Sequence, residues 1–355
     1  MSDILSIGAS ATQLYRASLS TVSNNIANLN TDGYTRQVSS STESTPSRQG
    51  TVYIGTGGRL ENVARAYDEF AEGTLRNSGS ELASQQPMID YANRIVNIMG
   101  AETSGLAGAM DQFFASANRL STDPASIPLR NIFLRDGDAL AARFRELSGQ
   151  LADIEQETQD KIELEVAKLN NLSEQLAEVN VQLNRTLSAE MQPARLLDQR
   201  DSLLRDLSQI TKINVRETAS GAVDVRLGSN VGTIAVTGAQ ATTFGSAFYA
   251  NQPGRVDLIS EPNGDTRPVS SATGGMLGGL IQLRNQVLAP AMDSFDSLAQ
   301  TVAQEMNAIH TSGLDARGER GKDLFKIDPI FDVTSPTVTS TIKASLAVAD
   351  SDAVT

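Results

Sequence analysis

The sequence predicts a mainly α-helical protein of several domains, with long helices of the bundle or coiled-coil kind and a small inserted β domain, in a multidomain α+β arrangement. Two long segments carry apolar residues at alternating intervals of three and four, the heptad pattern of helices that pack on helices. Another segment alternates apolar and polar residues and is rich in turn residues, as half-buried strands are. With 355 residues, the chain is also long for one core.

These patterns predict six segments. They are an N-terminal heptad helix with the motif at its end (1–35), an extended or β-hairpin linker (36–65), the first part of a helical domain (66–212), a small β insertion (213–272), a helix returning to the helical domain (273–325) and the start of a further β region (326–355).

The first predicted helix covers residues 3–29. It holds few large apolar side chains, so it needs a partner that buries its stripe. The pattern leaves two partners open, namely the rest of its own domain or an assembly core made with other helices. Its seam positions are Ile4, Ile7, Ala11, Leu14, Ser18, Thr21 and Asn25, with Val22 and Ile26 beside the last two.

The helix runs into the stretch NNIANLNTDGYTRQ (24–37), in which four of the first seven residues are Asn. Asn disfavours a helix interior because its side chain competes for backbone hydrogen bonds. Asn24, Asn25 and Asn28 are also too polar for a dry core. We therefore expect them to form hydrogen bonds across an assembled interface, or to fix the register there.

A turn is predicted directly after this helix, because Gly33 readily adopts a positive φ. Tyr34 is expected to dock its ring while its hydroxyl stays paired, and Arg36 to meet a neighbouring carboxylate. Residues 30–78 look extended, and TVYIGTGGRLENVAR favours short strands or a hairpin.

Residues 66–120 show helical spacing again, and Pro87 is expected to kink or divide this helix. The clearest helix follows, from about residue 129, because Pro128 delays its start. Its acidic flanks indicate a solvated face. Its seam positions are Ile162, Val166, Leu169, Ser173, Leu176, Asn180, Leu183 and Leu187. Another helix is predicted after Pro193, with Leu196, Leu203, Leu207 and Ile210 inward.

The segment 213–272 alternates with period two, so Val223, Val225 and Leu227 are expected on one side of a strand. Helical spacing returns over 275–310, and Pro290 should kink or restart that helix. The expected inward positions there are Leu280, Leu283, Val287, Phe295, Leu298, Val302, Met306 and Ile309. The last stretch favours strand and turn.

Composition excludes most catalytic chemistry. The chain has no Cys and a single His, His310, so thiolate sites and multi-histidine metal sites are excluded, and His310 is best explained as a polar residue near a helix end. Asp315, Gly318 and Asp323 faintly resemble a calcium loop, but the closing Glu is missing and basic residues would repel a cation. We expect no catalytic residues, no cofactor, no metal and no enzyme activity.

The net charge of −13 and pI of about 4.6 argue against nucleic-acid binding. Residues 1–80 are nearly neutral, with seven acids and six Arg, which favours packing against copies of the same chain. No apolar run reaches the length of a membrane span, so no membrane partner is expected. The first residues lack the basic and apolar regions of a cleaved leader.

The stretch TVSNNIANLNTDGYTRQ strongly resembles the N-terminal motif of the flagellar axial family of rod, hook and junction proteins. Three further stretches resemble the branch of this family at the hook–filament junction, and the match covers nearly the whole chain. They are AYDEFAEGTLR (66–76), LLDQRDSLLRDLSQI (196–210) and the segment from GGMLGGL to GKDLF (274–325).

This resemblance implies a structural protein of the bacterial flagellum that joins hook to filament by self-assembly through terminal helices. It implies export through the flagellar type III apparatus without a cleaved signal and an extracellular location. The implied partners are copies of the chain in a ring-like zone, the hook protein, the next junction protein toward the filament and an export chaperone. The implied assembly residues are Ile4, Ile7, Leu14, Val22, Asn24, Asn25, Ile26, Asn28, Gly33, Tyr34 and Arg36.

Two departures from the family stand out. Members continue past the position of Thr355 into a C-terminal heptad helix, so the chain is expected to be a truncated form or a part, which folds as a monomer and assembles poorly. Pro290 also interrupts a helix that the family usually runs without it. Two alternatives stay open: a hook or distal-rod axial protein, and, more remotely, a secreted enzyme or adhesin on a helical scaffold.

Overall fold

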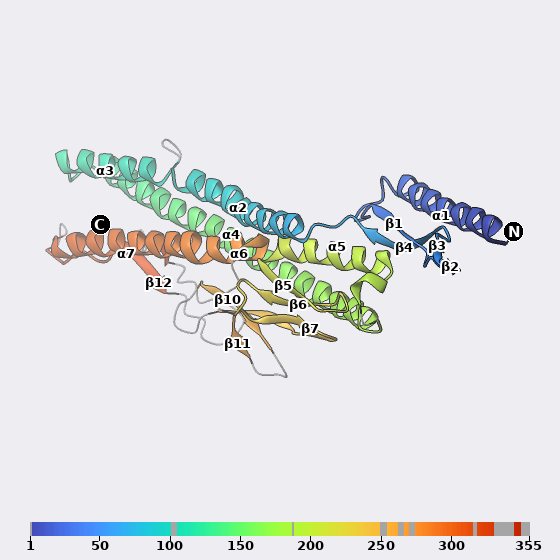
Figure 1. Ribbon diagram of the computed structural model, residues 1–355. Coiled ribbons are helices and arrows are strands. Elements are labelled where there is room, and N and C mark those ends of the chain that lie inside the picture. The colour runs from blue at the N-terminus through green and yellow to red at the C-terminus, as the bar shows by residue number, and fades with distance from the viewer. Residues whose placement is uncertain are drawn as a thin grey trace. The chain divides into compact units, whose positions relative to one another are not determined.

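The computed structural model of the chain is mainly helical, as predicted, with small antiparallel sheets (Figure 1). It describes residues 2–100, 105–186, 188–248, 254–261, 266–269, 274–314, 318–329 and 344–348. Leu187 and Asp315, named above, lie outside these ranges. The chain forms two compact units. One unit comprises Met1–Ser80 with Leu169–Thr242, and the other comprises Glu81–Lys168 with Thr243–Thr355.

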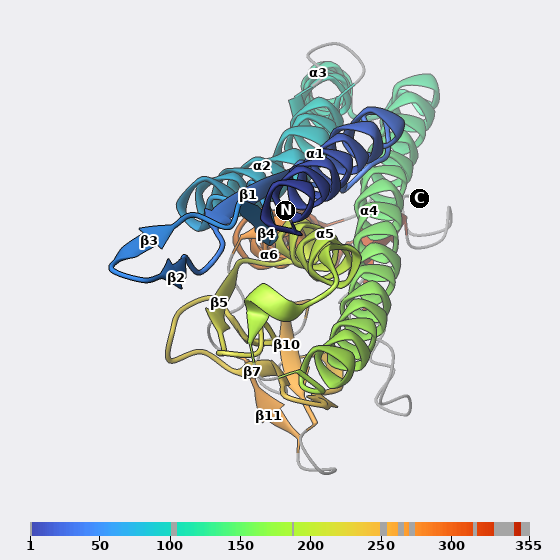
Figure 2. The same ribbon diagram turned by 45° about the vertical axis from the view of Figure 1, so that its right-hand side comes forward.

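The first unit begins with helix α1 (Ser2–Ala27) and an antiparallel ladder of β1 (Gln37–Glu43) with β4 (Gly58–Arg65). Between them a small hairpin of β2 (Ser47–Gln49) and β3 (Val52–Ile54) extends beyond the ladder (Figure 2). The predicted helix is confirmed, and Gly33, with a φ of 77°, turns the chain after it. The extended segment is confirmed as far as Arg65, but residues 69–78, which were also expected to be extended, belong to helix α2 (Glu69–Gly100).

The rest of the first unit packs the last part of helix α4 (Ile127–Leu183) and helix α5 (Ala194–Ile210) with one sheet. A short 3-10 turn, η1 (Ala189–Met191), joins the two helices. The sheet has the order β5 (Ile213–Glu217), β6 (Val223–Leu227), β7 (Ile234–Thr237) and β8 (Gln240–Ala241). The three predicted inward residues of β6 are buried. In α5, Leu203, Leu207 and Ile210 are buried as predicted, whereas Leu197 is buried in place of Leu196.

The second unit contains helix α3 (Leu106–Thr122), helix α6 (Gly275–Leu283) and helix α7 (Ala289–Ser312), together with residues 81–100 of helix α2 (Glu69–Gly100) and 127–168 of α4. Its three-stranded sheet has the order β11 (Arg267–Pro268), β10 (Val256–Ser260) and β9 (Phe244–Phe248). Strands β12 (Phe325–Pro329) and β13 (Ala344–Val348) pair with each other. The predicted β segment 213–272 therefore holds two separate sheets.

Helix α7 corrects one expectation, because its buried stripe is narrower than its sequence pattern. Phe295 is buried as predicted, but Leu298 and Ile309 are exposed, and the small residues Ala299 and Ala303 are buried instead. Small side chains let neighbouring backbone approach closely, so hydrophobicity alone misplaces the contact face.

The prolines act differently from one another. Pro87 does not divide α2, which runs through it, and Pro128 does not delay α4, which begins at Ile127, because proline fits the first turn of a helix. Pro290 does interrupt its helix. The chain passes through a π turn, η3 (Arg284–Leu288), directly before it, since proline cannot donate a hydrogen bond to residue 286.

Candidate functional site

One face of helix α1 is covered by the β1–β4 ladder. Ile7, Ser10 and Leu14 lie against the start of β4. A Cβ added at Gly57, the residue before the strand, would come within 2.5 Å of Ser10 Oγ, and one added at Gly58 within 3.4 Å of Leu14 Cδ2. Farther along, Ser39 Oγ on β1 donates to Ser18 Oγ at 3.3 Å. The predicted seam is thus covered from Ile7 onward, and its first partner is the β1–β4 ladder of the same chain, whereas its first position, Ile4, is exposed.

A second face of α1 is exposed and strongly apolar. We call it the free face, and it comprises Ile4, Leu5, Tyr15, Leu19, Val22 and Ile26. Leu5, Leu19 and Ile26 are 79%, 69% and 70% exposed. A helix with two apolar faces, of which its own unit covers one, has the geometry of a helix that docks a further partner.

The predicted assembly residues therefore divide between the two faces. Ile7 and Leu14 lie on the covered face, while Ile4, Val22 and Ile26 lie on the free face. Their roles in assembly stay predictions.

Asn25 ties the end of α1 to the segment that follows the turn. Its side-chain Oδ1 accepts hydrogen bonds from the Tyr34 hydroxyl at 2.7 Å and from the Gln37 backbone N–H at 2.9 Å. Its Nδ2 donates to the Gln37 carbonyl at 2.8 Å. The Tyr34 hydroxyl is paired, as the sequence predicted. Burial, followed by the nearby Asp198 carboxylate, raises the pKa of Tyr34, so the hydroxyl stays a proton donor.

Asn24 and Asn28 form a second set of hydrogen bonds one turn along the helix. Asn28 Nδ2 donates to both the backbone carbonyl and the side-chain Oδ1 of Asn24, each at 2.9 Å, and the Thr31 hydroxyl donates to Asn28 Oδ1. These contacts lie inside one chain. The Asn cluster thus ends the helix by itself, and any hydrogen bond to a neighbouring copy would come in addition.

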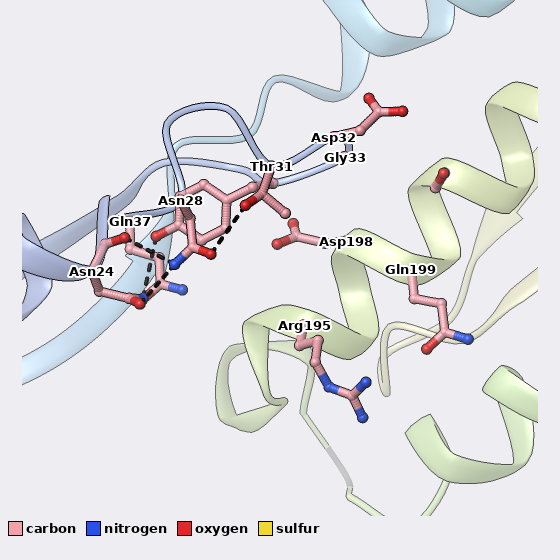
Figure 3. A pocket seen from close by; sticks show the side chains of 11 residues that line it. Asn24, Asn28, Thr31, Asp32, Gly33, Gln37, Arg195, Asp198 and Gln199 are labelled. Carbon is pink, nitrogen blue, oxygen red and sulfur yellow. Dashed lines mark hydrogen bonds between the residues drawn. The ribbon is translucent and has the colours of Figure 1, made fainter. Parts of the chain in front are cut away.

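An open groove of about 620 Å³ separates this Asn-rich helix end from α5. Figure 3 shows Asn24, Asn28 and Thr31 on one wall and Arg195, Asp198 and Gln199 on the other. Asp32 lies at the turn.

Among the described residues, the Arg36 guanidinium has no ion pair with a carboxylate, so its predicted partner would have to come from elsewhere.

Arg65, at the end of β4, joins the N-terminal elements to α5. Its Nη1 lies 2.8 Å from Asp198 Oδ1 and 2.7 Å from Asp201 Oδ2, and its guanidinium stacks over the Tyr67 ring at 4.8 Å. Only 7% of the Arg65 side chain is exposed. A desolvated arginine between two carboxylates fixes the position of the strand that carries it.

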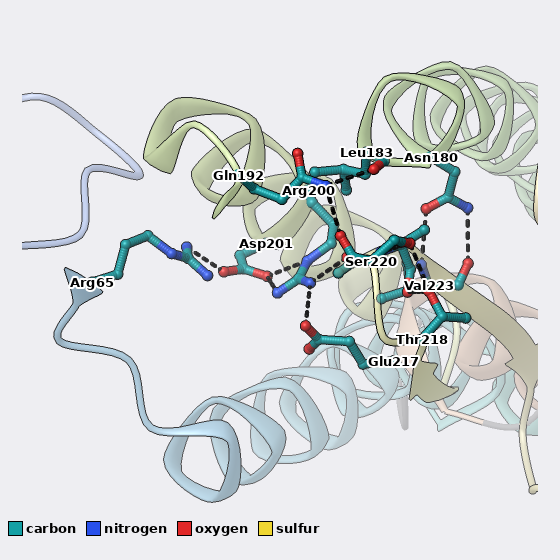
Figure 4. Close-up of polar contacts among 12 residues, drawn as sticks. Arg65, Asn180, Leu183, Gln192, Arg200, Asp201, Glu217, Thr218, Ser220 and Val223 are labelled. Carbon is teal, nitrogen blue, oxygen red and sulfur yellow. Dashed lines mark hydrogen bonds and ion pairs between the residues drawn. The ribbon is translucent and has the colours of Figure 1, made fainter. Parts of the chain in front are cut away.

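The contacts continue from Asp201 into the sheet (Figure 4). Asp201 accepts from Arg200, and Arg200 also pairs with Glu217 on β5 at 3.0 Å and donates to the Gly221 carbonyl. Burial lowers the pKa of Arg200, but Asp201 and Glu217 more than offset this, so its pKa is raised and it stays charged.

Sequence reasoning missed this network as a site. The only sequence signal for it was that Asp198 and Asp201 stand three residues apart, on one face of a helix. Both lie in the block 196–210, which drew attention only because it resembles the flagellar family.

The described residues contain no group of three or more His, Asp or Glu that could hold a metal ion, and none of their helices is long and apolar enough to cross a membrane. His310 lies in the last turn of α7, as predicted, and its Nδ1 contacts the Lys322 carbonyl.

Comparison with known proteins adds two family matches. The model of the flagellar hook-associated protein FlgK helical domain matches residues 92–325, and that of the flagella basal body rod protein matches residues 5–35.

Individual relatives agree. Flagellar hook-associated protein 1 of Salmonella typhimurium is 29% identical over 360 residues, which cover 100% of this chain and 65% of that protein. The Escherichia coli (strain K12) relative of the same name is 28% identical over 332 residues, covering 92% of this chain and 60% of its own length. The chain therefore spans less than two thirds of the length of these relatives.

A solved structure shows the same fold. The flagellar hook junction protein FlgK from Burkholderia pseudomallei superposes with a TM-score of 0.65 at 24% identity, over 72% of this chain and 47% of that one.

Proposed function

Because the chain belongs to the FlgK family of flagellar hook-associated proteins, we propose that it is a structural component of the bacterial flagellum. In this proposal it joins the hook to the filament by self-assembly through its terminal helix. The observation that carries the proposal is the free face of α1, which stays exposed although the opposing ladder already covers the helix on another side.

The proposed partners follow from that role. They are copies of the same chain in a ring-like zone, the hook protein, the next junction protein toward the filament, and an export chaperone. The chain would leave the cell through the flagellar type III apparatus and lie outside it. The relatives are named flagellar hook-associated proteins, and this supports a position next to the hook.

A junction role is favoured over a hook or distal-rod role by the extent of the two family matches. The rod-protein match covers only residues 5–35, whereas the FlgK helical-domain match covers residues 92–325. No arrangement of side chains in the described residues favours an enzyme or an adhesin.

A deletion strain tests the proposal. Loss of the gene should give hooks without filaments and filament subunits shed into the medium, and the native gene should restore filaments. Full-length filaments in the deletion strain would rule the junction role out.

The free face can be tested in the same strain. Leu19→Ser with Ile26→Ser should abolish filament restoration while the secreted amount stays unchanged, because both side chains are exposed and their loss leaves the folded chain intact. Leu164→Ser, which removes an exposed leucine of α4, is the control and should restore filaments. Equal restoration by both variants would remove the free face from the mechanism.

A further inference from the structure

The turn after α1 contains an Asp–Gly pair whose reactive groups are free. Asp32 and Gly33 are the two central residues of a β-turn, which the Tyr34 N–H closes by donating to the Thr31 carbonyl at 3.2 Å. The Asp32 side chain is exposed, and Figure 3 shows its carboxylate pointing away from the other residues that line the groove. Among the described residues, this carboxylate has no hydrogen bond and no ion pair.

The peptide nitrogen between these two residues is also unprotected. The Gly33 N–H has no hydrogen-bond partner among the described residues, because it lies in the middle of the turn and not in a helix or a strand. Glycine has no side chain that would hinder the approach of its nitrogen to a neighbouring carboxyl carbon. The open groove of about 620 Å³, which both residues line, gives water access to them. A carboxyl carbon, a free peptide nitrogen and water therefore meet at one peptide bond.

These are the groups that react when an aspartate isomerises spontaneously. The Gly33 nitrogen attacks the carboxyl carbon Cγ of Asp32, a C–N bond forms, and the carboxyl hydroxyl leaves with the amide proton as water. Water then adds to one of the two carbonyl carbons of the resulting five-membered succinimide. Opening at Cγ restores aspartate, whereas opening at the backbone carbonyl carbon breaks the original peptide bond and leaves isoaspartate. Water is lost and regained, so neither an oxidant nor a reductant takes part.

The other Asp–Gly pair of the chain, Asp136–Gly137, is an internal contrast. It lies inside helix α4, where the peptide N–H groups are bonded within the helix. Asp136 is only 6% exposed and accepts a hydrogen bond from Arg135. A Cβ added at Gly137 would lie 3.5 Å from the Phe113 ring, so this backbone is packed against a side chain. The same two residue types are thus shielded in α4 and open in the turn.

We propose that Asp32–Gly33 is a site of spontaneous isoaspartate formation, and that the product loosens the turn after α1. Isoaspartate lengthens the main chain by one atom, because the chain then runs through Cβ and Cγ of Asp32. Tyr34 and Gln37 follow directly, and both are held by Asn25. A longer main chain before them displaces them from Asn25. The modification does not depend on the proposed function and occurs whether or not the chain joins hook to filament.

Prolonged incubation of the purified chain at neutral pH and physiological temperature tests the site. Electron-transfer mass spectrometry assigns isoaspartate residue by residue, so product from the Asn263–Gly264 pair is counted separately. The folded chain should contain several-fold more isoaspartate at residue 32 than at residue 136, and in urea the yield at residue 136 should rise to that at residue 32. Equal yields in the folded chain, or a several-fold lower yield at residue 32 in the folded chain than in urea, would overturn the proposal.

Two variants check the chemistry. Asp32→Glu is the matched control, because it keeps the charge but would have to close a six-membered ring, which forms far more slowly. It should give no isomer at this position. Asp32→Asn should react several-fold faster, since an amide loses ammonia more readily than a carboxylic acid loses water at neutral pH. Equal rates in Asp32→Asn and Asp32→Glu would contradict the succinimide route.

The Gln37 N–H reports whether the turn loosens, because it donates to Asn25 Oδ1 at 2.9 Å. Its hydrogen exchange should accelerate several-fold in incubated chains that carry isoaspartate at residue 32. Incubated Asp32→Glu should exchange at the rate of the fresh parent chain. Unchanged exchange at Gln37 in an isomerised chain would refute the loosening of the turn.

Discussion

At the residue scale, Asn25 shows how one polar side chain can organise the end of a helix. It makes three hydrogen bonds, all to Tyr34 and Gln37 of the same chain. The expectation of hydrogen bonds across an assembled interface came from its polarity at a seam position. Polarity alone cannot tell a partner copy from the residues that follow a turn, and here the turn brings the nearer partners.

Gly33 is the residue on which that turn depends. Gly33→Val should impair assembly without unfolding residues 66–325, because its φ of 77° costs a β-branched residue about 1–2 kcal/mol and moves Tyr34 away from Asn25. Motility of a strain carrying the variant is the measurement. Gly33→Asn is the control, since Asn tolerates this backbone conformation, and it should swim normally. Normal motility with Gly33→Val would refute the role of the turn.

Asp296 on α7 predicts a pH dependence of stability. Burial, and then the neighbouring Asp293, raise the pKa of Asp296 to about 6. In the unfolded chain the pKa is about 3.9, so the folded state holds more protons between these values and the free energy of unfolding falls as pH rises through this window. The group is half-buried, so the effect is discounted to about 1 kcal/mol.

Urea unfolding at pH 4 to 7 measures this effect. Asp296→Asn should remove the decline and be more stable than the parent at pH 7. Asp293→Asn should only reduce it, because burial is the larger cause. A decline of equal size in Asp296→Asn would assign the pH dependence to other groups.

At the element scale, α1 shows what a periodic pattern can predict. The heptad rhythm identified the helix and its covered positions, Ile7 and Leu14, because spacing fixes which side chains share a face. It did not identify the partner, since a two-stranded ladder and a helix both accept an apolar stripe. It also passed over Leu5, Tyr15 and Leu19, which form a second face only when the whole helix surface is considered.

The contacts of Arg65 were not predictable from the sequence for a related reason. Its two carboxylate partners lie more than 130 residues away, on α5, and no local spacing links them. The same holds for Asn180, which was read as a seam position and in fact binds the β6 backbone at Val223 on both its oxygen and its nitrogen.

Arg65→Met tests whether this contact holds the N-terminal elements in place. The variant leaves Asp198 without its arginine in a largely buried site, and breaking a buried ion pair costs about 3–5 kcal/mol. Because Asp201 keeps Arg200, we expect the lower end of that range. Amide hydrogen exchange in β1 and β4 should accelerate by more than tenfold.

Arg48→Met is the matched control for that variant. Arg48 is exposed, and among the described residues its side chain donates to the Gly50 carbonyl of its own hairpin, so exchange in β1 and β4 should stay as in the parent. Unchanged amide exchange in Arg65→Met would show that α1 and the β1–β4 ladder stay in place without the ion pairs of Arg65.

At the scale of the whole molecule, two of the three boundaries between the compact units fall within helices. One lies after Ser80, inside α2, and one before Leu169, inside α4, while the third follows Thr242, in the loop between β8 and β9. A sequence marks boundaries by Gly, Pro and polar runs, and none of these is needed where one helix serves two units. The six segments predicted from the sequence followed such marks and stay a prediction as domains.

The net charge of the molecule sets how its copies respond to salt. Copies of a chain with a net charge of −13 repel one another, and the repulsion is screened as the Debye length falls from about 30 Å at 0.01 M to about 8 Å at 0.15 M salt. The free face of α1 is apolar, so screening leaves its attraction in place. Sedimentation velocity should therefore show self-association that strengthens several-fold over this range.

Glu174→Gln with Glu178→Gln, on an exposed face of α4, lowers the negative charge by two and should flatten the dependence of self-association on salt. Association that weakens as salt rises would mean that ion pairs between copies, and not apolar faces, hold the assembly together.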